Sequence, residues 1–390
     1  MCGLRDPIPA VVVSPILPEP PVTGGQKRTL RLLEAMEHAG LHPRVLTADT
    51  GDPEAAEALR RRGWTVETVP EPEPGLLDRL RQHAQRRPSP LLHGLAVRLT
   101  ELAQDAALVQ YEHTQSAYYR APAHAATVLS LHNIDSHAVA GSAERLTGLA
   151  WLREANRAAE LRTVERRVIP RVDRVLCVSE QDAAIVRGLG GRAVLAPNGV
   201  DDEFFAVDGP GDEDRALFFG HFGYEPNRRG VERFLAAGWP EVRRARPNAR
   251  LAIAGGGIDE RLRARIAHDG VDVLGLVGDL PAALAGARAV IVPIWEGGGT
   301  RLKVLEALAA GRTVVSTPLG ASGIGFEDGR HGLLAETPEA LAHALAGALG
   351  QPSTHGRDGR ILAERYRWKA ALSGASAFYS ETMARARFAR

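Results

Sequence analysis

A glycine-rich loop with charged residues at both ends is the part of the sequence best suited to chemistry. Glu296 stands before the three glycines at 297–299, and Arg301 and Lys303 follow them at the start of an apolar helix. Glycine lets the backbone come close to a ligand, and the free amides of a helix N-terminus attract anions. The loop is therefore predicted to bind a phosphate or a diphosphate.

The helix after this loop carries two charges that need partners. Seven of the nine residues from Leu302 to Ala310 are apolar, so the helix is predicted to be buried on nearly all sides. An unpaired charge is costly to bury. Lys303 and Glu306 either pair with each other on one helix face or meet the groups of a ligand. In the second case the carboxylate of Glu306 accepts sugar hydroxyls.

A second glycine loop lies near the N-terminus. Gly24 and Gly25 come before a helix whose first turn includes Lys27 and Arg28. This loop is either a second anion site or a simple turn. The chain contains neither G-x-x-x-x-G-K-[ST] nor a G-x-G-x-x-G after a strand, so the usual signatures of nucleotide hydrolysis and dinucleotide binding are missing.

His132 is the histidine best placed to bind a substrate. It ends a predicted strand and begins "HNID", with Asn133 and Asp135 beside it. The ring either faces a cleft, where it hydrogen-bonds a substrate, or satisfies the loop backbone. For metal binding, the tight acidic clusters "DD" and "DED" both fall in a predicted connector, and they are interpreted as solvated charge.

These residues are positioned by alternating strands and helices. In the first half, a strand, a glycine loop, a helix and a strand form a βαβ unit, which implies a parallel sheet. The strands of this half are predicted at 8–14, 41–48, 106–112, 126–132, 174–179 and 192–199, and the helices at 26–40 and about 144–168. Segment 70–90 is predicted to be a mobile surface region.

The alternation starts again after an acidic connector at 200–215. Strands are then predicted at 216–222, 250–257, 271–277, 288–294 and 313–318, with helices near 228–237, 259–268 and 280–287, in addition to the helix after the glycine loop. From residue 361 on, the chain has only helical character. Two successive parallel α/β domains are therefore expected.

Composition limits the class of protein. The 390 residues, 44% of them hydrophobic, suffice for two domains. With 48 basic and 47 acidic residues, the net charge of +1 predicts no general attraction to nucleic acid or anionic membranes. Cys2 and Cys177 form no disulfide or metal pattern, and the N-terminal apolar run is too short and proline-broken for a signal peptide. A soluble, cytoplasmic protein is expected.

The motif "EGGGTRLKVLEALAAGRTVVST" resembles the nucleotide-sugar-binding segment of a known family, the retaining glycosyltransferases with two Rossmann-like domains, family 4 of the GT-B class. Further stretches agree in the same order: "PPVTGGQKR", "LHNIDS", "VSEQDAAIVRGLGG" with "APNGVD", and "FFGHFGYEPN". Together they span most of the chain.

The resemblance implies an α/β fold of the GT-B type, in which two parallel sheets face each other across a cleft and a C-terminal helix crosses back to the first domain. On this basis residues 1–205 form a Rossmann-like acceptor-side domain and 206–365 a Rossmann-like donor domain for the nucleotide-sugar. Residues 366–390 form the helix that returns to the N-terminal domain.

The same resemblance assigns roles to individual residues. Glu296 lies by the transferred sugar and His132 contacts the donor sugar or the acceptor, so these two are the expected catalytic residues. Val277 is expected to hold the base through its backbone, and Glu306 the ribose. The expected donor-binding residues are Gly24, Gly25, Val277, Gly298, Gly299, Thr300, Arg301, Lys303 and Glu306. No metal ligand is expected.

Two features depart from the family pattern. Nine residues lie between Glu296 and Glu306, more than in many relatives. His221, and less directly Arg229, stands where many relatives have a basic diphosphate ligand. Arg301 and Lys303 are expected to supply that charge instead, which leaves the roles of His221 and Arg229 open.

The expected function is that of a retaining, hexosyltransferase-like enzyme. It would move a sugar from a nucleotide-diphosphate sugar, with a UDP-sugar favoured, to a hydroxyl of a glycan, a lipid-linked sugar or a small natural product. No cofactor or metal is needed if cations and helix amides stabilise the leaving diphosphate. Nucleic acid is not an expected partner, membrane contact is at most peripheral, and the oligomeric state is not predicted. The alternatives are an inert nucleotide-sugar binding protein and a nucleotide-sugar epimerase.

Overall fold

The computed structural model describes residues 7–21, 23–48, 52–70, 93–143, 147–297, 302–350 and 355–389. The chain divides into two compact units: Met1–Pro197 with Leu372–Arg390 form the first unit, and Asn198–Ala371 form the second. Part of the predicted anion loop lies outside the described residues, namely Gly298, Gly299, Thr300 and Arg301. The predicted surface segment 70–90 also lies outside them, except for its first residue.

The first unit is built on a seven-stranded sheet in the order β3-β2-β1-β4-β5-β6-β7, and all of its strand pairs are parallel. The strands are β1 (Ile8–Val13), β2 (Leu41–Ala48), β3 (Thr65–Val69), β4 (Leu108–Glu112), β5 (Ala126–Ser130), β6 (Arg174–Cys177) and β7 (Ala193–Leu195). Every residue of β1 is buried, as its unbroken apolar run predicts. The chain order reverses between β1 and β4, and this place is the topological switch point of the sheet.

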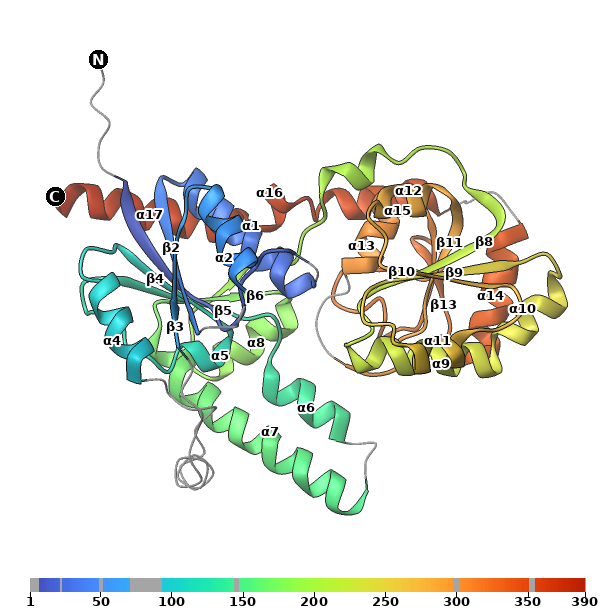
Figure 1. Ribbon diagram of the computed structural model, residues 1–390, viewed down its shortest axis with the longest axis horizontal. Coiled ribbons are helices and arrows are strands. Elements are labelled where there is room, and N and C mark those ends of the chain that lie inside the picture. The colour runs from blue at the N-terminus through green and yellow to red at the C-terminus, as the bar shows by residue number, and fades with distance from the viewer. Residues whose placement is uncertain are drawn as a thin grey trace. The chain divides into compact units, whose positions relative to one another are not determined.

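Helices cover both faces of this sheet (Figure 1). They are α1 (Gly24–His38), α2 (Pro53–Arg61), α4 (His93–Leu102), α5 (His113–Ser116), α6 (Asp135–Ala143), α7 (Gly148–Val168), α8 (Glu180–Gly188) and α17 (Ser373–Ala389), with a 3-10 turn at Ile169–Arg171. Helix α1 begins at Gly24, two residues before the predicted start at 26, because Thr23 and Gln26 form a reciprocal capping box. The predicted helix at 144–168 begins at Gly148.

The second unit contains a six-stranded sheet in the order β10-β9-β8-β11-β12-β13, again with parallel pairs. The strands are β8 (Asp212–Phe219), β9 (Arg250–Ala254), β10 (Val271–Gly275), β11 (Ala287–Val292), β12 (Thr313–Ser316) and β13 (Gly332–Leu334). The switch point lies between β8 and β11. Residues 212–215 were expected to belong to the acidic connector, but they form the start of β8, where Asp214 pairs with Arg246 at 2.9 Å.

The helices of the second unit also lie on both faces of its sheet (Figure 1). They are α9 (Glu225–Ala237), α10 (Trp239–Ala245), α11 (Glu260–Ile266), α12 (Leu280–Ala285), α13 (Leu302–Ala309), α14 (Pro338–Gly350), α15 (Gly356–Glu364) and α16 (Trp368–Ala371), with a 3-10 turn at Asp202–Ala206. The expected α/β class, with two Rossmann-like parallel sheets, is confirmed.

Helix α17 belongs to the first unit, although it follows the second unit in sequence. It packs on α1 and β7, and Tyr379 is completely buried there. The approach to β7 is close, since a Cβ atom on Gly374 would lie 2.7 Å from the carbonyl oxygen of Leu195. The first unit therefore consists of two separate stretches of chain.

Candidate functional site

Both switch points carry predicted site residues. In a parallel α/β sheet the loops at the carboxyl ends of the strands leave a crevice at the switch point, where ligands bind. We call the loops after β1, β4 and β5 the first switch point and those after β8 and β11 the second switch point. The first contains Gly24, Gly25 and His132, and the second contains Glu296, with Lys303 in the first turn of the helix that follows it.

At the second switch point, Lys303 lies against the loop that follows β8. Its Nζ donates to Oδ1 of Asn227 at 2.7 Å and lies 4.3 Å from the centre of the Phe218 ring. A Cβ atom on Gly220 would lie 2.7 Å from the same Nζ. The ammonium group is thus held where the backbone of a glycine passes, next to a neutral amide and an aromatic face.

Asn227 is a residue to which the sequence analysis gave no role. Its side chain is buried and joins two parts of the second switch point: Nδ2 donates to the carbonyl of His221 at 2.7 Å, and Oδ1 accepts from Lys303. Asn227 stands in the motif "FFGHFGYEPN", which is the signal that could have identified it. It fixes Lys303 relative to the loop after β8.

Glu296 lies beside Arg229 on the loop after β11. One carboxylate oxygen of Glu296 is 3.5 Å from Nη1 of Arg229, and the Glu296 side chain is 17% exposed. Arg229 also donates to Glu225 at 3.0 Å. The Nδ1 atom of His221, in contrast, accepts a hydrogen bond from the backbone amide of Gly223 at 3.0 Å, within its own loop. Of the two residues with open roles, Arg229 contacts an expected catalytic residue and His221 shapes a loop.

Gly297 shows why the predicted anion loop needs glycine. Its φ is +91°, and a Cβ atom there would lie 2.2 Å from the hydroxyl oxygen of Tyr224. Any side chain would therefore be both strained and obstructed. Two other expected donor-binding residues lie apart from this loop: Val277 follows β10 and packs on the core, and Glu306 lies buried in α13.

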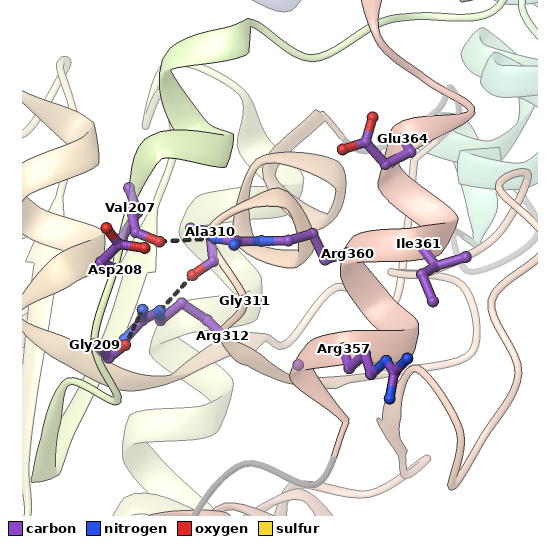
Figure 2. Close-up of a pocket in the computed structure, with 11 residues that line it drawn as sticks. Val207, Asp208, Gly209, Ala310, Gly311, Arg312, Arg357, Arg360, Ile361 and Glu364 are labelled. Carbon is purple, nitrogen blue, oxygen red and sulfur yellow. Dashed lines mark hydrogen bonds between the residues drawn. The ribbon is translucent and has the colours of Figure 1, made fainter.

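The C-terminal end of α13 is held by two arginines. Arg360 donates to the carbonyl oxygens of Ala309 and Val207 at 2.9 and 2.7 Å, and Arg312 donates to that of Ala310 at 2.8 Å. Both arginines line a pocket of about 580 Å³, and Figure 2 shows them among the other lining residues. Burial lowers the pKa of Arg312, and the charges of Arg360 and Arg288 lower it further. Cations at a helix C-terminus stabilise the helix, so α13 is anchored at the end away from Lys303.

At the first switch point, the start of α1 lies against His132. A Cβ atom on Gly25 would lie 2.9 Å from Nδ1 of His132, so glycine is required for this approach. The other ring nitrogen, Nε2, lies 2.8 Å from Oε2 of Glu112, and the His132 side chain is 13% exposed. The histidine therefore has one nitrogen on a buried carboxylate and the other towards the glycine loop.

Glu112 is the centre of a buried polar network that the sequence analysis missed. Besides His132, its carboxylate accepts from Nε2 of Gln110 at 2.6 Å and from Oγ1 of Thr29 at 3.2 Å. Burial alone would raise the pKa of Glu112, but the hydrogen bond from His132 and the positive charges nearby outweigh it and lower the pKa. Glu112 is thus an ionised acceptor. Its place at the end of β4, beside the switch point, is the signal that could have found it.

His113 and Arg28 complete the surroundings of Glu112. His113 has a φ of +64°, and its ring centre lies 4.1 Å from that of His132. Burial lowers the pKa of His113 to about 3, so its ring is neutral at physiological pH. Arg28 is buried and donates to the carbonyl of Ala196 at 2.7 Å.

Within the described ranges, no group of three or more His, Cys, Asp or Glu side chains is placed to hold a metal ion. In the same part of the chain, no helix is both long enough and apolar enough to cross a membrane.

Two family models match the chain in succession. The model described as Glycosyltransferase Family 4 matches residues 22–204, and the one described as Glycosyl transferases group 1 matches residues 213–351. The phosphatidyl-myo-inositol mannosyltransferase of Mycobacterium tuberculosis is 33% identical over 175 residues, which are 42% of this chain and 46% of that protein. The enzyme of the same name from Mycolicibacterium smegmatis is 33% identical over 42% of this chain and 45% of its own length. The match thus spans less than half the length of these curated relatives.

Solved structures resemble the whole chain. A glycosyltransferase from Rickettsia africae superposes with a TM-score of 0.67 at 12% identity, covering 97% of this chain and 99% of that one. Anabaena HepE in complex with UDP and glucose gives a TM-score of 0.62 at 14% identity, with 98% and 100% covered. WaaG, a glycosyltransferase of lipopolysaccharide biosynthesis, gives 0.65 at 17% identity, with 95% and 99% covered. At these identities the likeness establishes the fold alone.

Proposed function

We propose that this chain, which belongs to the group 1 glycosyltransferases of family 4, transfers a sugar from a nucleotide-diphosphate sugar to a hydroxyl of an acceptor. In this proposal residues 206–365 bind the donor, residues 1–205 serve the acceptor side, and residues 366–390 complete the N-terminal domain. The reaction keeps the configuration of the anomeric carbon and needs no metal. Retention rests on family membership.

One observation at the second switch point carries the proposal. Lys303 lies at the first turn of α13, 2.7 Å from Asn227 and close to the backbone of Gly220, and the same helix buries the carboxylate of Glu306. An ammonium group beside glycine backbone and a helix N-terminus suits a diphosphate. A buried carboxylate one turn further along the helix suits the hydroxyls of a ribose.

The proposed chemistry follows from these charges. Breaking the anomeric bond leaves positive character on the sugar and a negative diphosphate. Lys303 and the helix amides attract the diphosphate more strongly as its charge develops, which lowers the barrier. Glu296 orients the sugar and stabilises the positive centre. The acceptor hydroxyl attacks from the face that the diphosphate leaves, and a diphosphate oxygen takes its proton.

Two kinds of neighbour support the choice of substrates. A UDP-sugar is the preferred donor because HepE is known as a complex with UDP and glucose. The acceptor is a glycan, a lipid-linked sugar or a small natural product, and the mannosyltransferase relatives give reason to test an inositol-bearing lipid first.

The first test is binding. The chain has three lysines, at 27, 303 and 369, so amine acylation followed by mass spectrometry reports on each separately. UDP, GDP or ADP is expected to protect Lys303 and to leave the exposed Lys369 reactive. A nucleoside diphosphate at 100 times its dissociation constant should also raise the free energy of unfolding by about 2.7 kcal/mol. No protection and no stabilisation by any of the three would reject the donor site.

The second test is transfer. Nucleotide-sugars are incubated with acceptors, and the product is analysed by NMR for the anomeric configuration. Formation of a glycoside with the configuration of the donor supports the proposal. Binding without transfer to any acceptor would indicate an inert binding protein, and a changed sugar without any acceptor would indicate an epimerase.

A further inference from the structure

A chain of buried hydrogen bonds leads from α17 to His132. The hydroxyl of Tyr379 donates to Oε1 of Gln110 at 2.6 Å, and Nε2 of Gln110 donates to Oε1 of Glu112 at 2.6 Å. The other oxygen of Glu112 lies 2.8 Å from Nε2 of His132. Tyr379, Gln110 and Glu112 are all completely buried. This series of hydrogen bonds therefore begins on α17 (Figure 1, red) and ends on the expected catalytic histidine.

Each hydrogen bond in this chain has only one possible direction. The ionised carboxylate of Glu112 has no proton to give, so the NH₂ group of Gln110 must be the donor towards it. The amide oxygen of Gln110 then faces Tyr379 and accepts from its hydroxyl, which keeps its proton because burial holds the pKa of the phenol well above its usual range. Towards His132 as well, Glu112 can only accept. The proton between Glu112 and His132 must therefore lie on Nε2 of His132.

We infer that Glu112 is a positioning residue that fixes His132 in its Nε2–H form, and that the Tyr379–Gln110 pair holds Glu112 for this purpose. The inference deepens the proposed function and rests on it, because His132 is taken to contact the substrate. It assigns Nδ1 of His132, on the side of Gly25, to the substrate. There Nδ1 accepts the hydrogen bond of a sugar or acceptor hydroxyl.

The arrangement also fixes the orientation of the ring. A carboxylate that accepts the Nε2 proton holds the imidazole in one tautomer and one orientation. Two other groups near His132 are His113 on α5 and Asp135 on α6, and the ring of His113 packs on that of His132 without adding charge. Glu112 is hydrogen-bonded to the ring at 2.8 Å.

The test uses the whole protein and two measurements. Nitrogen-15 NMR of the His132 ring identifies the protonated nitrogen, and steady-state kinetics give kcat and KM with a nucleotide-sugar and an acceptor. Glu112→Gln is expected to mix the two neutral forms of the ring, because a glutamine amide both donates and accepts. The expected loss in kcat is about tenfold, as for one hydrogen bond to the reacting substrate, with little change in KM for the donor.

A pair of variants on α17 separates positioning from simple stability. Tyr379→Phe removes the hydroxyl that holds Gln110, and Thr382→Val removes a buried hydroxyl that donates to Phe378 on the same helix. Tyr379→Phe is expected to lower kcat in the same direction as Glu112→Gln, by a smaller factor, and to shift the His132 signals. Thr382→Val should leave both unchanged.

The outcomes distinguish this inference from the proposed function. If the wild-type ring carries its proton on Nδ1, or if Glu112→Gln keeps the wild-type kcat, the inference is wrong even though transfer occurs. If the wild-type protein transfers no sugar, the proposed function fails, and the catalytic role of the network fails with it. If Glu112→Gln does not fold, the wild-type NMR signals and the comparison of Tyr379→Phe with Thr382→Val decide the question.

Discussion

The two switch points occupy the same place in two similar sheets, but their charges are balanced in different ways. At the first, Glu112 accepts hydrogen bonds from Gln110, Thr29 and His132 inside the protein. At the second, Lys303 is hydrogen-bonded to the neutral amide of Asn227 and lies over an aromatic ring. At the first switch point, hydrogen-bond donors of the protein keep the carboxylate of Glu112 ionised. At the second, the ammonium group of Lys303 lies beside the backbone of Gly220.

This difference indicates that the two switch points have different roles. A network in which several side chains are hydrogen-bonded to one carboxylate fixes the orientation of those side chains. A cation beside glycine loops and a helix N-terminus is suited to receive an anionic ligand. The same fold thus supports an oriented histidine in one unit and an anion site in the other, and four experiments test the contrast.

The largest effect is expected for Glu296→Gln at the second switch point. The change keeps the size of the side chain but removes the charge proposed to stabilise the anomeric carbon. The transfer rate should fall by at least ~10²-fold, while nucleoside-diphosphate affinity hardly changes. Glu225→Gln, which removes the other carboxylate beside Arg229, is the matched control. Equal losses of rate and affinity would show that Glu296 holds the nucleotide, and unaltered transfer would remove it from the site.

Lys303→Ala tests the anion site itself. A charge-assisted hydrogen bond contributes about 1.5–3 kcal/mol, so UDP should bind about 10- to 150-fold more weakly by titration calorimetry. The same result is expected for Arg301→Ala. Lys369→Ala serves as the control, because it removes an exposed lysine of the same unit. If Lys303→Ala and Arg301→Ala both bind UDP with the wild-type affinity, the second switch point is not an anion site.

A smaller effect is expected beside the first switch point, at Asp135. Burial, followed by the charge of Glu165, raises the pKa of Asp135 to about 6. The native protein therefore binds the carboxyl proton of Asp135 more tightly than the unfolded chain does. The stability that the bound proton provides is lost as the pH rises through 6. At pH 8 the free energy of unfolding of Asp135→Asn should exceed that of the wild type by up to about 2–3 kcal/mol. Below pH 4 the two proteins should differ little in the free energy of unfolding. Equal differences in urea unfolding at both pH values would contradict this.

The smallest effect is expected from removal of metal ions. Positively charged side chains and helix amides are proposed to stabilise the leaving diphosphate, so transfer should continue in excess EDTA at its normal rate. A rate lost in EDTA and restored by magnesium or manganese would show that the second switch point works with a divalent cation.

The fold was largely readable from the sequence because its signals are local. The apolar run of β1 specifies a strand within a few residues, and the predicted helix at 26–40 corresponds to α1 at Gly24–His38. The start of β8 was missed because Asp212 and its neighbours have the composition of a loop. Its acidic residues are accommodated by a contact with Arg246, 32 residues away from Asp214, which no local pattern reveals.

In the candidate site, too, the residues that lie close together in the sequence could be predicted and the contacts between distant residues could not. The glycines, Lys303 and Glu306 stand in one short motif, so their association was visible in the sequence. The partners of His132 were not, because Glu112 lies 20 residues from it, and Tyr379 lies 269 residues from Gln110. Their contacts exist only after the sheet has formed and α17 has packed on it.

The membership of α17 in the first unit has a consequence for the order of events during synthesis. Asn198–Ala371 is continuous and contains all the strands of its own sheet, so it can fold as soon as it leaves the ribosome. The first unit begins to emerge earlier, but Tyr379 reaches the ribosomal exit only after the whole second unit has been made. The part of the protein that is translated first is thus completed last, and the hydrogen bond between Gln110 and Tyr379 forms only after translation has passed residue 379.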